Sequence, residues 1–364
     1  MIQTSETVSR DTRFAPVYQV LEEAIASHAF PGCAFGLLAE GETTHLGAVG
    51  RFTYEEDAPL VQAETVFDLA SVSKVVGTTA MAMLLVQRGQ LDPEIPVGEL
   101  LPGFVVGRGY GSLAHHIKLR HLLAHNSGLP GYVEFFRQNR TPAELYRACL
   151  NLALEAEPGA RCEYSDPGFI LLGKALEVLT KERLEVWTKR EIFAPLGMTS
   201  TFYNPPASRR EAIPPTEEDI SFRRRRIQGE VQDENAWVLG GAAGHAGLFS
   251  NVRDLLKFSA AVLGEKSAPA LFEESTVEAF SVRQSPAGSS RALGWDTPSP
   301  ESSAGKYFSA RSLGHLGYSG CSLWIDREAR IAAVLLSNRT WPERKSQLIK
   351  QIRPAFHNAI RQVL

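Results

Sequence analysis

Strand-like segments lie near both ends of the chain, and helix-like segments lie between and beside them. Four short apolar runs bounded by turn residues are typical of β-strands: residues 32–38, 43–49, 322–325 and 331–337. The first two flank Glu40-Gly41-Glu42 and are therefore expected to pair. Amphipathic helices are predicted before this pair and at the end of the chain, over residues 14–28 and 346–363. The pattern predicts an α/β domain assembled from both ends of the chain.

The middle of the chain is mainly helical in pattern and rich in loops. Its clearest helices are predicted over residues 142–154, 169–179 and 184–193. A further helix is predicted over residues 251–263, with Ser250 or Asn251 as its cap. We therefore expect an α/β domain formed by residues 1–89 and 240–364, and a mainly helical domain formed by residues 90–239. Residues 203–235 have no clear periodicity.

A serine and a lysine three residues apart stand at the head of an apolar run over residues 75–86, after a short strand at Val66-Phe67. The run has almost no polar face, which indicates a buried helix. On this helix Ser71 and Lys74 share a face, so the hydroxyl and the ammonium can touch. A neighbouring lysine is one way to activate a serine as a nucleophile, and burial is expected to lower the pKa of that lysine. The alternative is a helix-capping serine beside a surface lysine.

Two further motifs follow in the chain. Tyr164-Ser165-Asp166 precedes a helical run, and His315-Leu316-Gly317 precedes an apolar strand. The order Ser-x-x-Lys, Tyr-x-Asp, His-x-Gly resembles the serine β-lactamase and penicillin-binding superfamily, and most closely its class C-like branch, which includes family VIII carboxylesterases, D-amino-acid peptidases and acyltransferases. Residues 121–130 and 240–250 also look like this branch. The resemblance covers nearly the whole chain.

The resemblance implies a fold and a set of roles. The fold class it implies is α+β, an antiparallel sheet flanked by helices with an adjoining all-α domain, and the site lies in the cleft between the two. Ser71 would be the nucleophile, while Lys74 and Tyr164 would share the proton transfers. The backbone N–H groups of Ser71 and Tyr318 would form the oxyanion hole. The remaining positions would line the substrate site: Asp166, His315 and Gly317. Such chemistry needs no metal and no organic cofactor.

Two departures from the lactamase pattern bear on the activity. Asp166 stands where lactamases have Asn, and His315 stands where most lactamases and penicillin-binding proteins have Lys. We expect Asp166 to pair with Lys74 and keep it protonated, which leaves Tyr164 as the stronger base, with its pKa lowered by the ammonium. A neutral His315 would hold a substrate carboxylate poorly. These departures favour a carboxylesterase. The alternatives are a D-amino-acid peptidase or weak β-lactamase, and a catalytically silent protein that binds peptides or partners.

Composition narrows the choice of partners. The 364 residues are 44% apolar and 22% charged with a net charge of −3, which is typical of a globular protein without attraction for polyanions. We therefore expect a small-molecule ester or amide as the partner, and no nucleic acid. No run of 18 apolar residues occurs and residues 1–7 lack the features of a signal peptide, so we expect a cytoplasmic protein without a membrane span. The sequence does not indicate an oligomeric state.

Other candidate features have simpler interpretations. His121 and His125 have helical zinc-site spacing, but the glutamate of His-Glu-x-x-His is missing, and a structural role is favoured. The basic run at residues 223–226 follows acidic residues and is expected to form local ion pairs, although contact with an anionic substrate is an alternative. His245 is read as structural, with substrate contact as the alternative. The cysteines are scattered and predict neither a disulfide framework nor a metal site: Cys33, Cys149, Cys162 and Cys321.

Overall fold

The computed structural model describes residues 11–364 and is built around a five-stranded antiparallel sheet with the strand order β2-β1-β10-β9-β8. The residues on which the signal-peptide expectation rests, 1–7, lie outside the described residues. The two ends of the chain meet in the centre of this sheet, where Cys33 lies opposite Ser337. The strands are β1 (Gly32–Ala39), β2 (Glu42–Gly50), β8 (Ser312–Leu316), β9 (Ser322–Asp326) and β10 (Ile331–Ser337). The predicted antiparallel sheet is confirmed.

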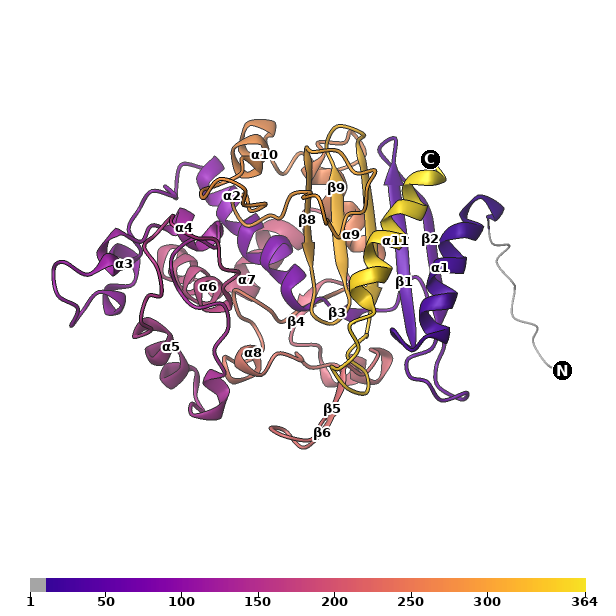
Figure 1. Ribbon diagram of the computed structural model, residues 1–364, viewed down its shortest axis with the longest axis horizontal. Coiled ribbons are helices and arrows are strands. Elements are labelled where there is room, and N and C mark those ends of the chain that lie inside the picture. The colour runs from indigo at the N-terminus through magenta and orange to yellow at the C-terminus, as the bar shows by residue number, and fades with distance from the viewer. Residues whose placement is uncertain (1–10) are drawn as a thin grey trace.

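Helices cover both faces of this sheet, which is why β1 is apolar and buried along its whole length. On one face, α1 (Ala15–Ala26) and α11 (Ile349–Gln362) lie side by side and pack on Phe35 and Trp324 (Figure 1). On the other face, α9 (Val252–Val262) contacts β1 and β10. Alternate side chains of a strand point to opposite faces, so Ala34 and Leu38 join the larger core on the α9 side.

The segment that carries the candidate nucleophile runs from the sheet side into the helical part of the molecule. It consists of β3 (Phe67–Asp68), the 3-10 turn η2 (Ala70–Val72), the π-helical turn η3 (Lys74–Thr79) and α2 (Ala80–Gln87). Among residues 11–364, one helical run, Ala70–Gln87, has the length and apolar composition of a membrane span, and 83% of it is buried inside the protein. The core helix of a folded domain has the same properties, and this run packs as one.

The helical part lies on the far side of the nucleophile helix from β2 (Figure 1). A longer helix here, α6 (Asp166–Thr180), begins three residues earlier than predicted, because the Ser165 hydroxyl accepts a hydrogen bond from Gly168 N at 3.0 Å and Pro167 fits the first turn. The other helices are α3 (Val97–Leu100), α4 (Leu119–Leu123), α5 (Pro142–Leu150), α7 (Leu184–Thr188) continued by η7 (Lys189–Phe193), α8 (Glu234–Val238) and α10 (Glu274–Ser281). A small sheet of β4 (Phe202–Tyr203) and β7 (Leu248–Ser250) joins β3.

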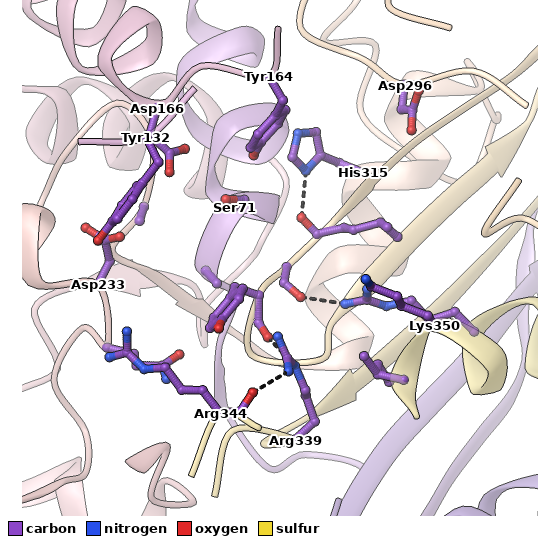
Figure 2. A pocket seen from close by; sticks show the side chains of 18 of the residues that line it. Ser71, Tyr132, Tyr164, Asp166, Asp233, Asp296, His315, Arg339, Arg344 and Lys350 are labelled. Carbon is purple, nitrogen blue, oxygen red and sulfur yellow. Dashed lines mark hydrogen bonds between the residues drawn. The ribbon is translucent and has the colours of Figure 1, made fainter. Parts of the chain in front are cut away.

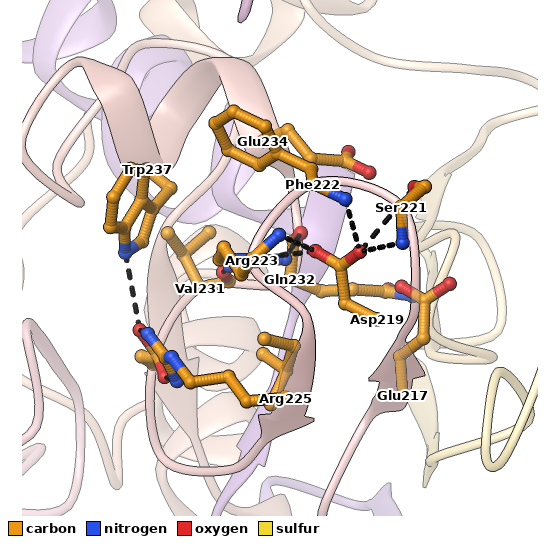
Figure 3. Close-up of polar contacts among 12 residues, drawn as sticks. Glu217, Asp219, Ser221, Phe222, Arg223, Arg225, Val231, Gln232, Glu234 and Trp237 are labelled. Carbon is orange, nitrogen blue, oxygen red and sulfur yellow. Dashed lines mark hydrogen bonds and ion pairs between the residues drawn. The ribbon is translucent and has the colours of Figure 1, made fainter. Parts of the chain in front are cut away.

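The stretch without clear periodicity contains a short hairpin of β5 (Glu217–Asp219) and β6 (Arg225–Ile227) (Figure 3). Asp219 accepts hydrogen bonds from three backbone N–H groups of the turn and from Arg223 Nε, which hold the pKa of Asp219 at about 2 against the effect of burial. Arg223 in turn donates to the carbonyls of Val231 and Gln232. The predicted ion pairs of the basic run are therefore present, and the hydrogen bonds of Arg223 fasten the hairpin to the segment that leads into α8.

Candidate active site

Ser71 lies in the 3-10 turn η2, immediately after a strained residue. Ala70 has a φ of +45°, a region that non-glycine residues rarely adopt. Its N–H is held by the Asp68 carboxylate at 2.8 Å, and the same carboxylate accepts a hydrogen bond from Gln232 N at 2.7 Å. Burial raises the pKa of Asp68 to about 6. This turn leaves the Ser71 side chain partly exposed at the wall of a cavity.

Lys74 is fully buried behind Ser71 and makes three polar contacts. Its Nζ donates to Ser71 Oγ at 2.9 Å, to Asp166 Oδ1 at 2.7 Å and to the carbonyl of His245 at 3.0 Å. The expected contact between Asp166 and Lys74 is therefore present. Burial by itself lowers the pKa of Lys74, but the Asp166 carboxylate outweighs it and the pKa lies above its usual value. The expected net lowering of this pKa by burial is therefore wrong, whereas the expectation that Asp166 keeps Lys74 protonated agrees with the raised pKa.

Tyr164 lies beside Lys74, whose Nζ is 4.8 Å from the centre of its ring. The tyrosine hydroxyl is buried near the side chains of Lys74 and Ser71, but no contact within the described residues has the geometry of a hydrogen bond. Burial raises the pKa of Tyr164, and the opposing effect of Lys74 does not overcome it. The predicted lowering of this pKa is therefore wrong. In the resting site the lysine is charged and the tyrosine is neutral.

The loop that carries the tyrosine is held from behind by His125. Its ring lies 4.5 Å from the ring of Tyr164, and its Nδ1 accepts a hydrogen bond from Ser165 N at 2.9 Å. Burial lowers the pKa of His125 well below its usual value, so the ring is neutral. His121 Nδ1 accepts a hydrogen bond from Lys118 N at 3.1 Å. Both histidines are thus engaged with backbone, and no group of three or more metal-ligating side chains occurs within residues 11–364.

His315 lies beside Tyr164, with 5.8 Å between the two ring centres, near the end of β8 (Figure 2). Its Nδ1 lies 2.8 Å from the carbonyl of Leu316, and since a carbonyl only accepts, the proton is on Nδ1. Burial lowers the pKa of His315 well below its usual value, so the ring is neutral, and its Nε2 presents a lone pair that has no partner in the part of the chain that the structure describes. The side chain can accept a hydrogen bond from a substrate, but it cannot act as a cation.

The turn after β8, which carries Tyr318, packs against the segment that leads to Ser71. It is closed by a hydrogen bond from Gly320 N to the carbonyl of Gly317 at 3.0 Å. A Cβ at Gly317 would lie 2.4 Å from the carbonyl oxygen of Leu69, so only glycine allows this turn to approach the nucleophile segment so closely. Ser319 Oγ adds a hydrogen bond to the carbonyl of Asp68 at 2.7 Å. Both expected oxyanion-hole residues, Ser71 and Tyr318, line the same cavity.

The cavity has a volume of about 630 Å³ and a charged lining. Six of the predicted site residues line it and Lys74 stands directly behind them, so the structure brings the predicted set together (Figure 2). Several lining residues were not predicted: Tyr132, Asp233, Glu234, Arg291, Arg339, Arg344, Lys350 and Arg353. They lie in loops or in helices without a recognisable motif. The one available signal is Arg339, a charged residue two positions after a buried strand.

The glycine-rich segment at residues 240–250 packs behind the nucleophile helix. The carbonyl of Gly244 accepts a hydrogen bond from Thr78 Oγ1 at 2.7 Å, and Leu248 N donates to Ser73 Oγ at 3.0 Å. The His245 side chain points to Asp233, with 2.8 Å between His245 Nε2 and Asp233 Oδ1. Burial alone raises the pKa of Asp233, but His245 and the N–H of Ala236 hold it at about 2. His245 therefore has a structural contact, as expected.

Fold and site together define a serine hydrolase of the β-lactamase and penicillin-binding type. Residues 17–354 match the Beta-lactamase family, and the chain belongs to that family. It is 30% identical over 371 residues to an N-acetylmuramyl-L-alanine amidase of Bacillus subtilis, which covers 93% of this chain and 84% of the relative. It is also 30% identical to a putative D-alanyl-D-alanine carboxypeptidase of Salmonella typhimurium, over 76% of this chain and 69% of the relative.

Solved structures share the fold at low sequence identity. A penicillin-binding protein homologue from Caulobacter crescentus superposes with a TM-score of 0.77 at 18% identity, over 99% of this chain and 100% of that one. EstCE1, described as a hydrolase with promiscuous acyltransferase activity, superposes with a TM-score of 0.75 at 23% identity, over 95% of this chain and 99% of that one. The predicted fold class and superfamily are thus confirmed.

Proposed function

We propose that this protein is a carboxylesterase that cleaves its substrate through an acyl-enzyme on Ser71. The observation that carries the proposal is the chain of contacts Ser71–Lys74–Asp166 at the wall of the cavity, with 2.9 Å between Ser71 Oγ and Lys74 Nζ. A serine needs a neighbour that takes its proton before it can attack a carbonyl. Lys74 and Tyr164 are the groups placed to do so.

The protonation states of Lys74 and Tyr164 decide which form of the site can react. Lys74 is charged and Tyr164 is neutral in the resting site, so the pair has to lose one proton before it can accept the proton of Ser71. Ser71 Oγ then bonds to the carbonyl carbon, the carbonyl oxygen becomes an oxyanion, and the N–H groups of Ser71 and Tyr318 donate to it. Collapse of the intermediate expels the alcohol, which takes the proton from the pair. A water molecule cleaves the acyl-enzyme by the same sequence of proton transfers.

The state of His315 supports ester substrates over β-lactams. A neutral imidazole whose proton is committed to Leu316 offers only a lone pair, so it does not attract the carboxylate that β-lactam antibiotics carry. Asp166 neutralises the charge of Lys74, so the lysine offers no free positive charge to a carboxylate either. Both features disfavour a carboxylate near Ser71.

An amidase is the second candidate. It is favoured by the amidase of Bacillus subtilis, which is 30% identical over 93% of this chain, and by the charged side chains that line the cavity, since these suit a polar substrate such as a peptide or amino sugar. The chemistry at Ser71 is the same, except that the leaving group is an amine. An unprotonated amine nitrogen leaves less readily than an alkoxide, so amide cleavage depends more strongly on proton donation to the leaving group. A D-amino-acid peptidase activity belongs to the same alternative.

The test is covalent labelling followed by a substrate panel. We expect an activated short-chain ester to add one acyl group to the wild-type protein, as seen by intact-mass spectrometry, and Ser71→Ala to show none while its circular dichroism is unchanged. Turnover of p-nitrophenyl esters, muramyl-peptide amides, D-peptides and cephalosporins then separates the candidates. An adduct that persists in Ser71→Ala would place the nucleophile elsewhere, and a higher kcat/KM for a cephalosporin than for every short ester would exclude the esterase.

A further inference from the structure

We propose that two arginines outside the sequence motifs, Arg339 and Arg353, are positioning residues for the turn that carries the Tyr318 N–H. Both line the cavity, and both donate hydrogen bonds to backbone carbonyls of this turn. The proposal rests on the proposed function, because it assigns the arginines a part in stabilising the oxyanion that forms on attack by Ser71.

Arg353 is a buried cation whose partners are carbonyl groups. It lies in α11, is 7% exposed, and donates from Nη2 to the carbonyls of Gly317 at 2.5 Å and Cys321 at 2.8 Å. No carboxylate within residues 11–364 forms an ion pair with it. Burial lowers the pKa of Arg353 to about 10, which reflects the cost of burying a charge without an opposite charge. In return, the buried Arg353 guanidinium forms two charge-assisted hydrogen bonds to one turn.

The contact of Arg353 with Gly317 acts on the peptide group that carries the oxyanion-hole N–H of Tyr318. The carbonyl of Gly317 and the N–H of Tyr318 belong to one planar peptide unit and point in opposite directions. A guanidinium on the carbonyl therefore fixes the direction of the N–H. It also polarises the unit, so that the N–H becomes a stronger donor to an oxyanion on the other side. Arg353 thus acts on the reaction through Tyr318 and without contact with the substrate.

Arg339 holds the same turn at its next peptide group. Its Nε donates to the carbonyl of Tyr318 at 2.7 Å, and its guanidinium carbon lies 4.3 Å from the centre of the Tyr318 ring. Its Nη1 donates to the carbonyl of Ser346 at 2.9 Å, which ties the turn to the loop before α11. The peptide groups on both sides of the Tyr318 Cα are therefore held by a guanidinium.

The same arginines could instead bind an anionic substrate, since a carboxylate would neutralise a buried cation in a cavity wall. The two roles predict different kinetics. An arginine that holds the oxyanion turn affects every substrate equally and acts on kcat, because the oxyanion exists only in the transition state. An arginine that binds a carboxylate affects only substrates that carry one and acts mainly on KM. A neutral ester and its carboxylate-bearing analogue therefore distinguish the roles.

The experiment compares Arg353→Met, Arg353→Lys and Arg339→Met with the control Arg361→Met. Arg361 lies on the same helix and also donates to a backbone carbonyl, that of Tyr307 at 3.2 Å, but it does not line the cavity. We expect Arg353→Met to lower kcat roughly ten- to a hundredfold for p-nitrophenyl butyrate and p-nitrophenyl hydrogen succinate alike, somewhat less than loss of an oxyanion donor itself. KM should change less than about threefold, and inhibition by phenylboronic acid should weaken in parallel.

Each outcome decides the proposal. Arg353→Lys, which keeps the charge, should recover part of kcat, and Arg339→Met should fall in kcat as well. Arg361→Met should behave as wild type. A loss confined to the KM of the succinate ester, or an unchanged kcat in both Arg353→Met and Arg339→Met, would overturn it. Should Arg353→Met not fold, Arg353→Lys and Arg339→Met decide by the same measurements. Failure of the wild-type protein to form any adduct on Ser71 would instead refute the proposed function.

Discussion

At the scale of single residues, the site is governed by the charge state of Lys74. The lysine is fully buried, yet it is charged, because Asp166 Oδ1 lies 2.7 Å from its Nζ. Desolvation considered alone predicts a neutral Lys74. The sign of a buried pKa shift is set by the partner that the fold supplies, and this partner stands 92 residues further along the chain.

Asp166→Asn should move the pH dependence of the reaction. The carboxylate raises the pKa of Lys74, so the deprotonated form is scarce at neutral pH and kcat/KM rises with pH. With the carboxylate removed, the pKa of Lys74 falls and the rising limb moves to lower pH, while ester turnover is retained. The measurement is kcat/KM for a neutral ester across the pH range in which the protein stays folded.

Asp296→Asn is the matched control for that experiment. Asp296 also lines the cavity, but it pairs with Arg291 at 3.8 Å and does not touch Lys74. Its substitution removes the same charge from the cavity, but the rise of kcat/KM with pH should occur at the same pH as in the wild-type protein. An equal shift in both variants would mean that the overall charge of the cavity sets the profile. An unshifted Asp166→Asn would show that Lys74 is not the titrating group.

Tyr164→Phe should lower kcat about a hundredfold or more, in the range usual for loss of a general acid or base. The hydroxyl is buried near Lys74 and Ser71 and forms no hydrogen bond of good geometry within residues 11–364, so it is placed to exchange a proton with a reacting group. Steady-state kinetics with a neutral ester make the measurement. Tyr132→Phe, which removes a hydroxyl from the same cavity, should change kcat little. A near-normal kcat in Tyr164→Phe would leave Lys74 as the sole base.

At the scale of elements, the sequence predicts long periodic segments well and short ones poorly. The helix predicted over residues 251–263 is α9, Val252–Val262, with Asn251 Oδ1 accepting from Asp254 N at 2.9 Å. By contrast, β8 escaped prediction because Ser-Leu-Gly-His-Leu is short and has no β-branched residue. It becomes a strand only through its pairing with β9. The predicted helix over residues 142–154 ends at Leu150, where α5 gives way to a turn.

The residues of the candidate site likewise fall into those that the sequence predicts and those that it does not. The residues within motifs, such as Ser71, Lys74 and Tyr164, could be predicted because their spacing or order carries the signal. Arg353 could not, because it lies in an amphipathic helix in which an arginine is unremarkable. Its place against Gly317 follows from how α11 packs on the sheet, 36 residues away along the chain. Side chains that act through the backbone of another segment leave no local pattern.

Gly244→Ala should test the contact between the glycine-rich segment and α6. A Cβ at Gly244 would lie 2.0 Å from the carbonyl oxygen of Phe169 and 3.0 Å from the Cα of Gly173. The segment would have to move, and it carries the His245 carbonyl that holds Lys74. We expect a loss of about 1–3 kcal/mol in the free energy of unfolding, as in other overpacked cores, together with reduced kcat. Chemical denaturation and ester kinetics measure the two effects.

Gly109→Ala is the neutral comparison, since a Cβ there meets nothing within 4 Å. It should leave stability within about 0.5 kcal/mol of the wild type, as surface substitutions usually do. Wild-type stability in Gly244→Ala would contradict the close packing described for the two segments.

At the scale of the whole molecule, the sheet and the helical part share one hydrophobic core. The larger core joins Leu38 and Val334 of the sheet to Ile170 and Leu176 of α6. The nucleophile helix passes through it, and the candidate site lies at its edge. That residues 1–89 with 240–364 form one domain and residues 90–239 another stays a prediction. Because the two parts share one core, we expect the stability of each to depend on the other.

A shared core predicts that both parts unfold together. Leu176 is fully buried in α6, and Leu176→Ala should cost about 2–5 kcal/mol through lost burial and the cavity left behind. If the core is one cooperative unit, calorimetry should give a single transition whose calorimetric and van't Hoff enthalpies agree, and the substitution should shift all of it. Val178→Ala, on the same helix but 42% exposed, should shift it little. Two transitions, of which Leu176→Ala moves only one, would show that the helical part unfolds separately from the sheet, and the site between them would then open before the sheet melts.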